Sequence, residues 1–187
     1  MSEWGPLASL AGTWEGNDGV DLSFHNAEGR VGETGYFERL ELKPFGPVDN
    51  GKQVLYGLDY RMAAWRHGEE TQNPFHTEVG YWLWDAADGQ VMRCFMIPRA
   101  TVLIAGASCA TDSRDFTLRA RLGEASYGIL ENRYLAANAS TRSYECRITV
   151  HDDDSWSYDE DSVVALTAFA GQELHHTDRN TLHRVKA

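Results

Sequence analysis

The sequence predicts an all-β fold, namely an up-and-down antiparallel barrel of about ten strands that follows a short N-terminal helical turn. Three features of the chain lead to this prediction. Apolar and polar residues alternate over several runs, short turn-forming segments separate these runs, and tryptophan and tyrosine are frequent within them. A sheet of this size either closes on itself or splits into two packed layers, so a β-sandwich is the alternative that periodicity alone does not exclude.

The predicted elements follow the chain in order. A proline early in residues 5–10 and a small apolar face predict the helical turn. Residues 36–43, 116–122 and 144–150 then alternate between apolar and polar side chains, which is the pattern of half-buried strands. Phe37 and Glu38 break the alternation of the first run.

The segments between the strands are too short to hold crossover helices, and they are rich in the Asp, Asn, Gly and Ser that favour tight turns. They include residues 49–51, 88–89, 112–113 and 151–155. We therefore expect hairpin connections throughout. Residues 123–141 form the least regular segment, and we expect them to cap or flank one mouth of the barrel.

Length and composition predict a single domain over residues 1–187 that is cytoplasmic and binds no nucleic acid. Of the 187 residues 42% are apolar, enough for one core, and no apolar stretch is long enough for a membrane span or a signal peptide. The formal charge of −11 would repel a phosphate backbone. The three cysteines are odd in number and far apart, so they indicate small buried strand residues rather than disulfides or a thiolate zinc site.

Aromatic side chains within the predicted strands suggest a barrel wide enough to hold a ligand. They include Trp14, Trp65, Trp82, Trp84, Trp156, Tyr56, Tyr60, Tyr81 and Tyr158. Such rings line or fill a barrel interior, and a flat apolar ligand would suit them. Ordinary core packing explains the same rings, so the chemistry of the site has to separate the two interpretations.

Three segments in this order resemble the nitrobindin family, namely GTWEG at residues 12–16, FHTEVGY at residues 75–81 and LHR at residues 182–184. The resemblance extends from about Leu7 to Val185. It implies a ten-stranded barrel related in shape to fatty-acid-binding proteins and lipocalins. It also implies a b-type haem in one mouth of the barrel, held by a histidine just before the last strand.

The resemblance places the axial iron ligand at His176, with the adjacent His175 as the alternative. One imidazole nitrogen binds iron while an acceptor orients the other; a polar turn without a ligand explains the same pair. One residue more than in typical members separates His176 from the final LHR, and an extra residue reverses the face of a strand. We expect a bulge at residues 178–180 to keep His176 inward; without it, His175 becomes the candidate. His183 is expected to be a strand residue and not a ligand.

The resemblance implies further contacts with the haem. Gly12, Trp14 and Gly16 fall in the segment that edges the cofactor, although the glycine-rich signature departs after Gly16. A bent first strand would need the same glycines without any ligand. Arg99 and Ile104 fall in a hairpin along the cofactor edge, where a guanidinium suits a propionate; a surface salt bridge is the alternative for Arg99.

His76 and Glu78 are two apart on a predicted strand, so both face the same way and are expected to line the cavity opposite the axial histidine. His76 over the open iron position would hydrogen-bond or protonate a bound molecule. A zinc site would need a third ligand, and a solvent-facing pair is the other alternative. Met92, Cys94 and Met96 share one strand face, and any of them as a second axial ligand would favour electron transfer instead.

For function, the resemblance implies a five-coordinate iron in a largely apolar pocket that binds nitric oxide and isomerises peroxynitrite to nitrate. The residues alone do not show whether the protein acts as an enzyme, a sensor or a scavenger. A haem-free carrier of a fatty-acid-like or other apolar small molecule is the main alternative. A third is a different reaction that uses His76, Glu78 or Arg99 as acid, base and anion clamp.

Overall fold

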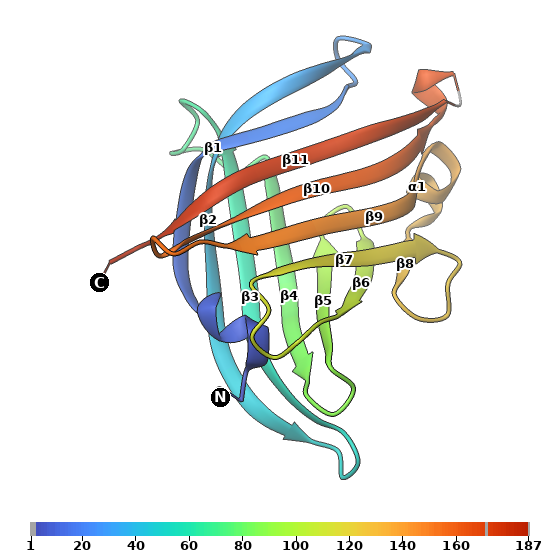
Figure 1. The fold of residues 1–187 in the computed structure, drawn as a ribbon. Helices are drawn as coiled ribbons and strands as arrows, with labels where there is room; N and C mark the ends of the chain where they lie inside the picture. The colour runs from blue at the N-terminus through green and yellow to red at the C-terminus, as the bar shows by residue number, and fades with distance from the viewer. Residues whose placement is uncertain (1–2, 171, 187) are drawn as a thin grey trace.

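The computed structural model describes residues 3–170 and 172–186 and shows a closed, almost entirely antiparallel β-barrel (Figure 1). The strands are β1 (Gly12–His25), β2 (Arg30–Asp49), β3 (Val54–Arg66), β4 (His76–Asp85), β5 (Gln90–Ile97), β6 (Thr101–Ser108), β7 (Asp115–Leu122), β8 (Gly128–Glu131), β9 (Ala139–Val150), β10 (Ser155–Leu166) and β11 (Glu173–Arg184). The helices are η1 (Gly5–Ser9), α1 (Arg133–Asn138) and η2 (Thr167–Phe169). The predicted barrel and the predicted N-terminal turn are confirmed.

Most neighbouring strands are consecutive hairpins, and β1 pairs with both β2 and β11 to close the barrel. The exception comes from the irregular segment 123–141. It forms the short β8, which lies between β6 and β7 and pairs with β7 in parallel, and then α1, which packs against β9. Asn132 caps α1 by accepting hydrogen bonds from two backbone amides. The segment flanks one end of the barrel, as expected.

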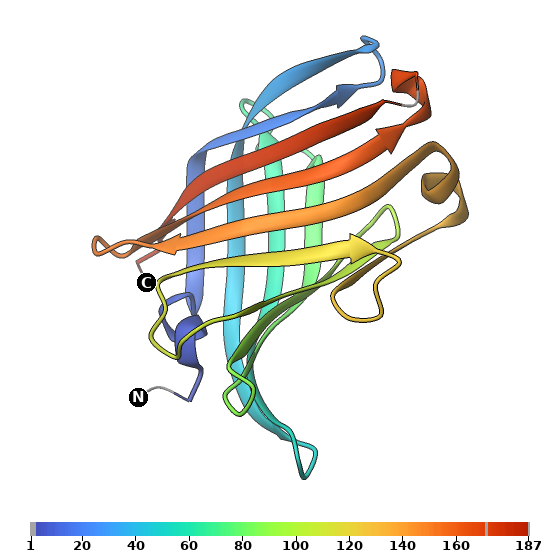
Figure 2. The ribbon, with the colours of Figure 1, turned by 45° about the vertical axis from the view of Figure 1, so that its right-hand side comes forward.

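One end of the barrel is closed by the N-terminal turn (Figure 2). Leu7 and Leu10 are fully buried there, and Nε1 of Trp14 donates to the carbonyl oxygen of Leu10 at 2.7 Å. Gly5 has a φ of +52° and lies directly against the ring of Trp84, so no side chain fits at this position. A packed apolar core therefore fills this end, where β1 begins and β11 ends.

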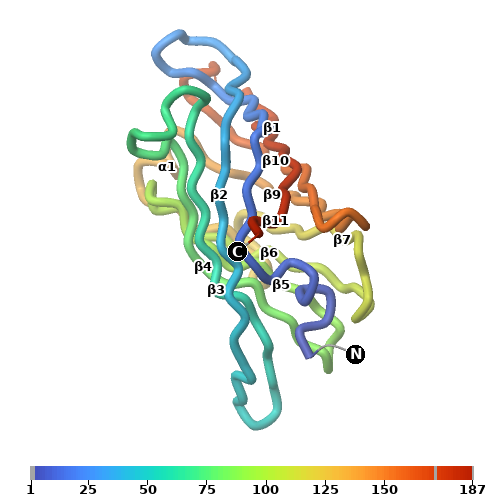
Figure 3. Tube along the Cα trace, turned by 90° about the vertical axis from the view of Figure 1, so that its left-hand side faces the viewer, coloured from blue at the N-terminus to red at the C-terminus, as the bar shows by residue number. Residues whose placement is uncertain are grey.

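The first strand changes its inward face halfway along. Figure 3 shows the trace of β1 beside that of β2. The register of β1 shifts by one residue against β2 between Gly16 and Gly19, and against β11 between Glu15 and Val20; Asn17 and Asp18 within this stretch are exposed. Such a β-bulge reverses which residues face inward. Asp21 consequently points into the barrel, where Val20 would point without the extra residue.

Two further expectations concern the cysteines and membranes. Cys146 is buried in β9 and Cys94 is partly buried in β5, whereas Cys109 follows β6 and lies outside the strands, so its prediction as a strand residue is wrong. All three are free thiols. Within residues 3–170 and 172–186 no helix has the length and apolar character to cross a membrane.

We expect Leu10→Ala to destabilise the fold by about 2–5 kcal/mol, because it leaves a cavity in the closed end. Urea denaturation measures the free energy of unfolding. Leu130→Ala is the control, because Leu130 is 74% exposed and its truncation should change little. Equal losses of unfolding free energy in the two variants would contradict the packed core at the closed end.

Candidate functional site

At the opposite end of the barrel, solvent reaches inward-facing side chains. His176 near the start of β11 and His76 at the start of β4 both point inward, yet their side chains are 40% and 31% exposed. Their inward direction follows from strand alternation, because His176 shares its face with the buried Asn180 and Leu182. This open end places two imidazoles on separate strands around one mouth.

His176 is held by a carboxylate on the neighbouring strand. Nε2 of His176 lies 2.6 Å from Oδ1 of Asp21, and the hydroxyl of Ser23 donates to Oδ2 of Asp21 at 2.6 Å. Burial alone would raise the pKa of Asp21, but the contact with His176 outweighs it and the pKa is lowered. Burial alone would lower the pKa of His176, but the hydrogen bond and the charge of Asp21 raise this pKa above the ordinary 6.5. The bulge in β1 creates this pair, because it turns Asp21 inward.

His175 points the other way. Its side chain is exposed on the outer surface, and Nδ1 lies 2.7 Å from Oδ2 of Asp161. The expected bulge at residues 178–180 is wrong, because β11 pairs with β10 in unbroken register. Without that bulge His175 was expected to become the candidate, but His176 faces inward and His175 outward, so this expectation is wrong as well. His183 is an exposed strand residue.

His76 and Glu78 share an inward face, as the spacing predicts. Nε2 of His76 lies 3.1 Å from Oε1 of Glu78, which is itself buried. Burial would lower the pKa of His76, but Glu78 beside it raises the pKa above 6.5. Glu78 therefore favours the protonated form of His76.

Arg93 lies below the two histidines and is buried in the barrel interior. Its guanidinium donates to Glu78 at 2.6 Å, to Glu160 at 3.0 Å and to the Tyr60 hydroxyl at 2.9 Å. It also donates to the hydroxyl of Tyr144. Charge-assisted hydrogen bonds of this kind offset the cost of burying an ion.

The two carboxylates bound to Arg93 respond differently. Burial alone would raise the pKa of Glu78, but Arg93, His76 and Tyr60 lower it to about 2. Burial raises the pKa of Glu160 despite the nearby guanidinium. The difference arises because Glu78 has an additional cationic partner in His76.

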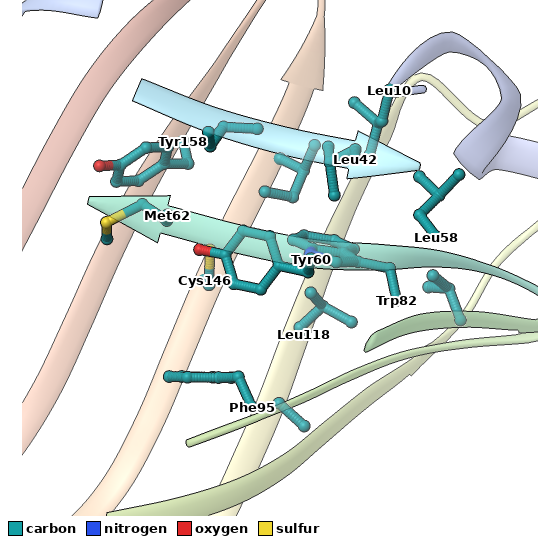
Figure 4. Packing of buried hydrophobic residues seen from close by; sticks show 14 of the residues in the cluster. Leu10, Leu42, Leu58, Tyr60, Met62, Trp82, Phe95, Leu118, Cys146 and Tyr158 are labelled. Atoms are coloured by element: carbon teal, nitrogen blue, oxygen red, sulfur yellow. The ribbon is translucent and has the colours of Figure 1, made fainter. Parts of the chain in front are cut away.

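Aromatic rings surround the guanidinium within the barrel. The rings are those of Tyr60, Trp82, Phe95 and Tyr144, with centroids 4.3 to 6.0 Å from the guanidinium carbon. Figure 4 shows Tyr60 and Trp82 side by side within the apolar core. Arg93 is thus a buried charge that both carboxylates and aromatic rings enclose.

A second polar cluster lies on the other side of the interior. Glu38 accepts hydrogen bonds from the Tyr158 hydroxyl at 2.8 Å and from Nδ2 of Asn180 at 3.0 Å. The Tyr36 hydroxyl contacts that of Tyr158 at 2.7 Å and donates to Asp178. Burial raises the pKa of Glu38 to about 7. The two clusters make the floor of the open end charged and polar, which corrects the expectation of a largely apolar pocket.

The structure does not bring all of the predicted cofactor contacts to the open end. Gly12 and Trp14 lie at the closed end, where Trp14 is buried in the core. Gly16 lies midway along β1 and makes room for the side chain of Asn180, which a Cβ would meet. Ile104 is 46% exposed on the outer surface of β6.

Arg99 lies in the exposed turn between β5 and β6, at the rim of the open end. Within the described part of the chain its side chain forms no ion pair, so it can meet an anionic group there. Met92, Cys94 and Met96 alternate with the buried Arg93 and face outward. They do not reach the interior and cannot bind an iron there.

Sequence reasoning gave no site role to most of the polar groups at this end, namely Asp21, Tyr36, Arg93, Glu160, Asp178 and Asn180, and it named Tyr158 only as an aromatic ring of the interior. A signal was present for some of them. Arg93 alternates with Val91 and Phe95, so it occupies the apolar face of its strand, as Glu38 does in β2. A charged residue in an apolar period-two face indicates a buried, paired charge. Asp21 carried no such signal, because the bulge that turns it inward was not expected there.

Comparison with known proteins identifies the family. Residues 3–184 match the model of the THAP4-like, heme-binding beta-barrel domain. The protein belongs to this family. The match spans nearly the whole chain and confirms the resemblance to nitrobindins.

A solved structure supports the fold of this heme-binding domain. The crystal structure of Rv2717c from M. tuberculosis aligns with a TM-score of 0.71 and 15% sequence identity, covering 100% of this chain and 99% of that chain. At this identity the likeness concerns the fold alone. A search of curated proteins found no match.

The residues at the open end fit a haem in their donor chemistry. His176 is an inward imidazole with one nitrogen on a carboxylate and with no partner on Nδ1 among the described residues. Histidines that bind metals usually pair their second nitrogen with such an acceptor. No group of three or more His, Cys, Asp or Glu side chains suited to a bare metal ion occurs in the described ranges. The donor set therefore suits a metal that brings its own equatorial ligands.

We expect Arg93→Leu to destabilise the protein by about 3–5 kcal/mol at pH 7, because two buried carboxylates lose their cation. The lowered pKa of Glu78 contributes stability that is present above pH 4.5 and lost as the pH falls towards about 2. The difference in the free energy of unfolding between variant and wild type should therefore become smaller below pH 4.5. Urea denaturation at pH 7 and pH 3 measures it.

Arg147→Leu is the control, because Arg147 forms an exposed ion pair with Asp115 and should cost at most about 1 kcal/mol. An effect of Arg93→Leu that is equally large at pH 7 and pH 3 would contradict the role of the two carboxylates.

Proposed function

We propose that the open end binds a b-type haem, with His176 as the axial iron ligand. The observation that carries this proposal is the inward imidazole of His176, oriented by the buried carboxylate of Asp21 at 2.6 Å. The family description supports it, because it names a heme-binding barrel. When bound, the haem supplies an iron with one open position, suited to binding nitric oxide and to isomerising peroxynitrite to nitrate.

Charge balance favours a cation beside His176. The pKa of Asp21 is lowered and that of His176 is raised, so each group favours the charged form of the other. A ferric porphyrin core on the other ring nitrogen would replace that positive charge. The Asp21 carboxylate keeps the remaining ring N–H in place, so the imidazole stays oriented.

Two other residues have roles at the same end. Glu78 on Nε2 favours the protonated form of His76, and Nδ1 has no partner in the described part of the chain, so a protonated His76 can donate a hydrogen bond from Nδ1 to a bound small molecule. Arg99 at the rim offers a guanidinium to a propionate. These roles follow from position and chemistry.

The charged floor disfavours the haem-free carrier of an apolar metabolite. An acyl chain that entered the barrel would lie against Glu160 and Arg93, and removing water from such groups without new partners is costly. A planar ligand at the mouth leaves that floor undisturbed. Fatty-acid binding remains an outcome that the following titration detects.

We expect His176→Ala to weaken hemin binding by more than about 100-fold, since losing the ligand costs more than losing its hydrogen-bond partner. Titration with hemin, followed by the Soret band, measures the affinity. His175→Ala is the matched control, because His175 is the next residue on the same strand and faces outward. Histidine-independent binding, or displacement of a fluorescent fatty acid without hemin affinity, would contradict the proposal.

We expect hemin affinity to rise with pH until His176 loses the competing proton, above pH 6.5. Asp21→Asn lowers the pKa of His176, so the rise should move to lower pH, and the plateau affinity should fall by about 10–100-fold. Hemin titrations from pH 5.5 to 8.5 on both proteins test this. Identical pH profiles would show that Asp21 does not orient the ligand.

A further inference from the structure

Four side chains from three strands form one hydrogen-bonded chain in the interior. The hydroxyl oxygen of Tyr158 on β10 lies 2.8 Å from Oε2 of Glu38 on β2 and 2.7 Å from the hydroxyl oxygen of Tyr36. Tyr36 in turn donates to Oδ1 of Asp178 on β11. Glu38 is 1% exposed, whereas Asp178 is partly exposed, two residues along β11 from His176. The chain therefore leads from the buried interior to the open end.

Counting protons shows that one carboxyl group of this chain is protonated. Three hydrogen bonds need three protons, and the two phenols supply two. If both phenols donate to carboxylates, no proton lies between the hydroxyl oxygens of Tyr36 and Tyr158, and their lone pairs face each other at 2.7 Å. A carboxyl group must supply the third proton. Burial raises the pKa of both carboxyl groups, that of Asp178 included, and we place the proton on Glu38 because it is 1% exposed whereas Asp178 is partly exposed. In this state Glu38 donates to Tyr158, Tyr158 donates to Tyr36, and Tyr36 donates to Asp178.

We propose that Glu38, Tyr158 and Tyr36 form a proton relay that delivers one proton to a ligand bound at the open end. The Tyr36 hydroxyl gives its proton to a basic ligand atom that replaces Asp178 as its partner. The proton of Tyr158 moves to Tyr36, and that of Glu38 moves to Tyr158. Both phenols are restored, the ligand gains one proton, and Glu38 is left as a carboxylate that keeps the N–H of Asn180 at 3.0 Å. Solvent protons return by the reverse path.

The surroundings of Glu38 suit a proton store near neutral pH. From across the interior, Glu78 on β4 opposes ionisation of Glu38 and Arg93 on β5 favours it, while Tyr158 and Asn180 stabilise the carboxylate by hydrogen bonds. Burial outweighs these contacts and raises the pKa to about 7. The relay needs a ligand at the open end, but it does not require that ligand to be a haem.

The relay is tested on the protein without ligand by infrared spectroscopy. A carboxyl stretching band present in the wild type at pH 6 and absent in Glu38→Gln identifies the proton of Glu38. Its shift after transfer into heavy water then gives the rate at which this proton exchanges. Tyr36→Phe is the most informative variant, because Tyr36 belongs to the relay but does not contact Glu38.

We expect Tyr36→Phe and Tyr158→Phe each to slow this exchange at least about tenfold, because each interrupts the path. Tyr60→Phe is the matched control, a buried tyrosine whose hydroxyl binds Glu78 and Arg93 and lies outside the relay. Near-ultraviolet circular dichroism confirms folding, and either folded relay variant decides the result. Exchange at the wild-type rate, or no band removed by Glu38→Gln, overturns the proposal.

Discussion

The buried guanidinium of Arg93 is the interaction on which the arrangement of the interior depends. It binds Glu78 on β4 and Glu160 on β10, and aromatic rings surround it. A charge at this depth has to be paired, so the strands that carry its partners are fixed relative to β5. At the closed end the core is packed and apolar, whereas His76 and His176 meet solvent at the open end.

The open end acquires its chemistry from backbone irregularity as well as from side chains. The bulge in β1 turns Asp21 inward, and Asp21 orients His176 on the adjacent strand. The regular register of β11 keeps His176, Asp178 and Asn180 on one face. Two imidazoles paired with carboxylates and a phenol chain ending at Asp178 thus gather at one mouth. The proposed haem site and the proposed relay share this mouth but depend on different residues.

Much of the fold follows from the sequence, because alternation and turn composition are local signals. The strand over residues 144–150 and the N-terminal turn are of this kind. The inward direction of His176 also follows from alternation, counted back from the buried Leu182. The partners of Arg93 and the bulge at Asn17 and Asp18 could not be predicted from the sequence, because contacts across a barrel and the position of an extra residue depend on how the strands pair. Ile104 fell within the expected cofactor hairpin but faces outward for the same reason.

The most direct test of the account is a crystal structure of the protein with hemin. The account predicts a porphyrin at the open end, with its iron bonded to a ring nitrogen of His176, Asp21 on the other nitrogen, and Arg93 still paired with Glu78 below it. Hemin on the outer surface of the barrel, or iron bound by any residue other than His176, would contradict it.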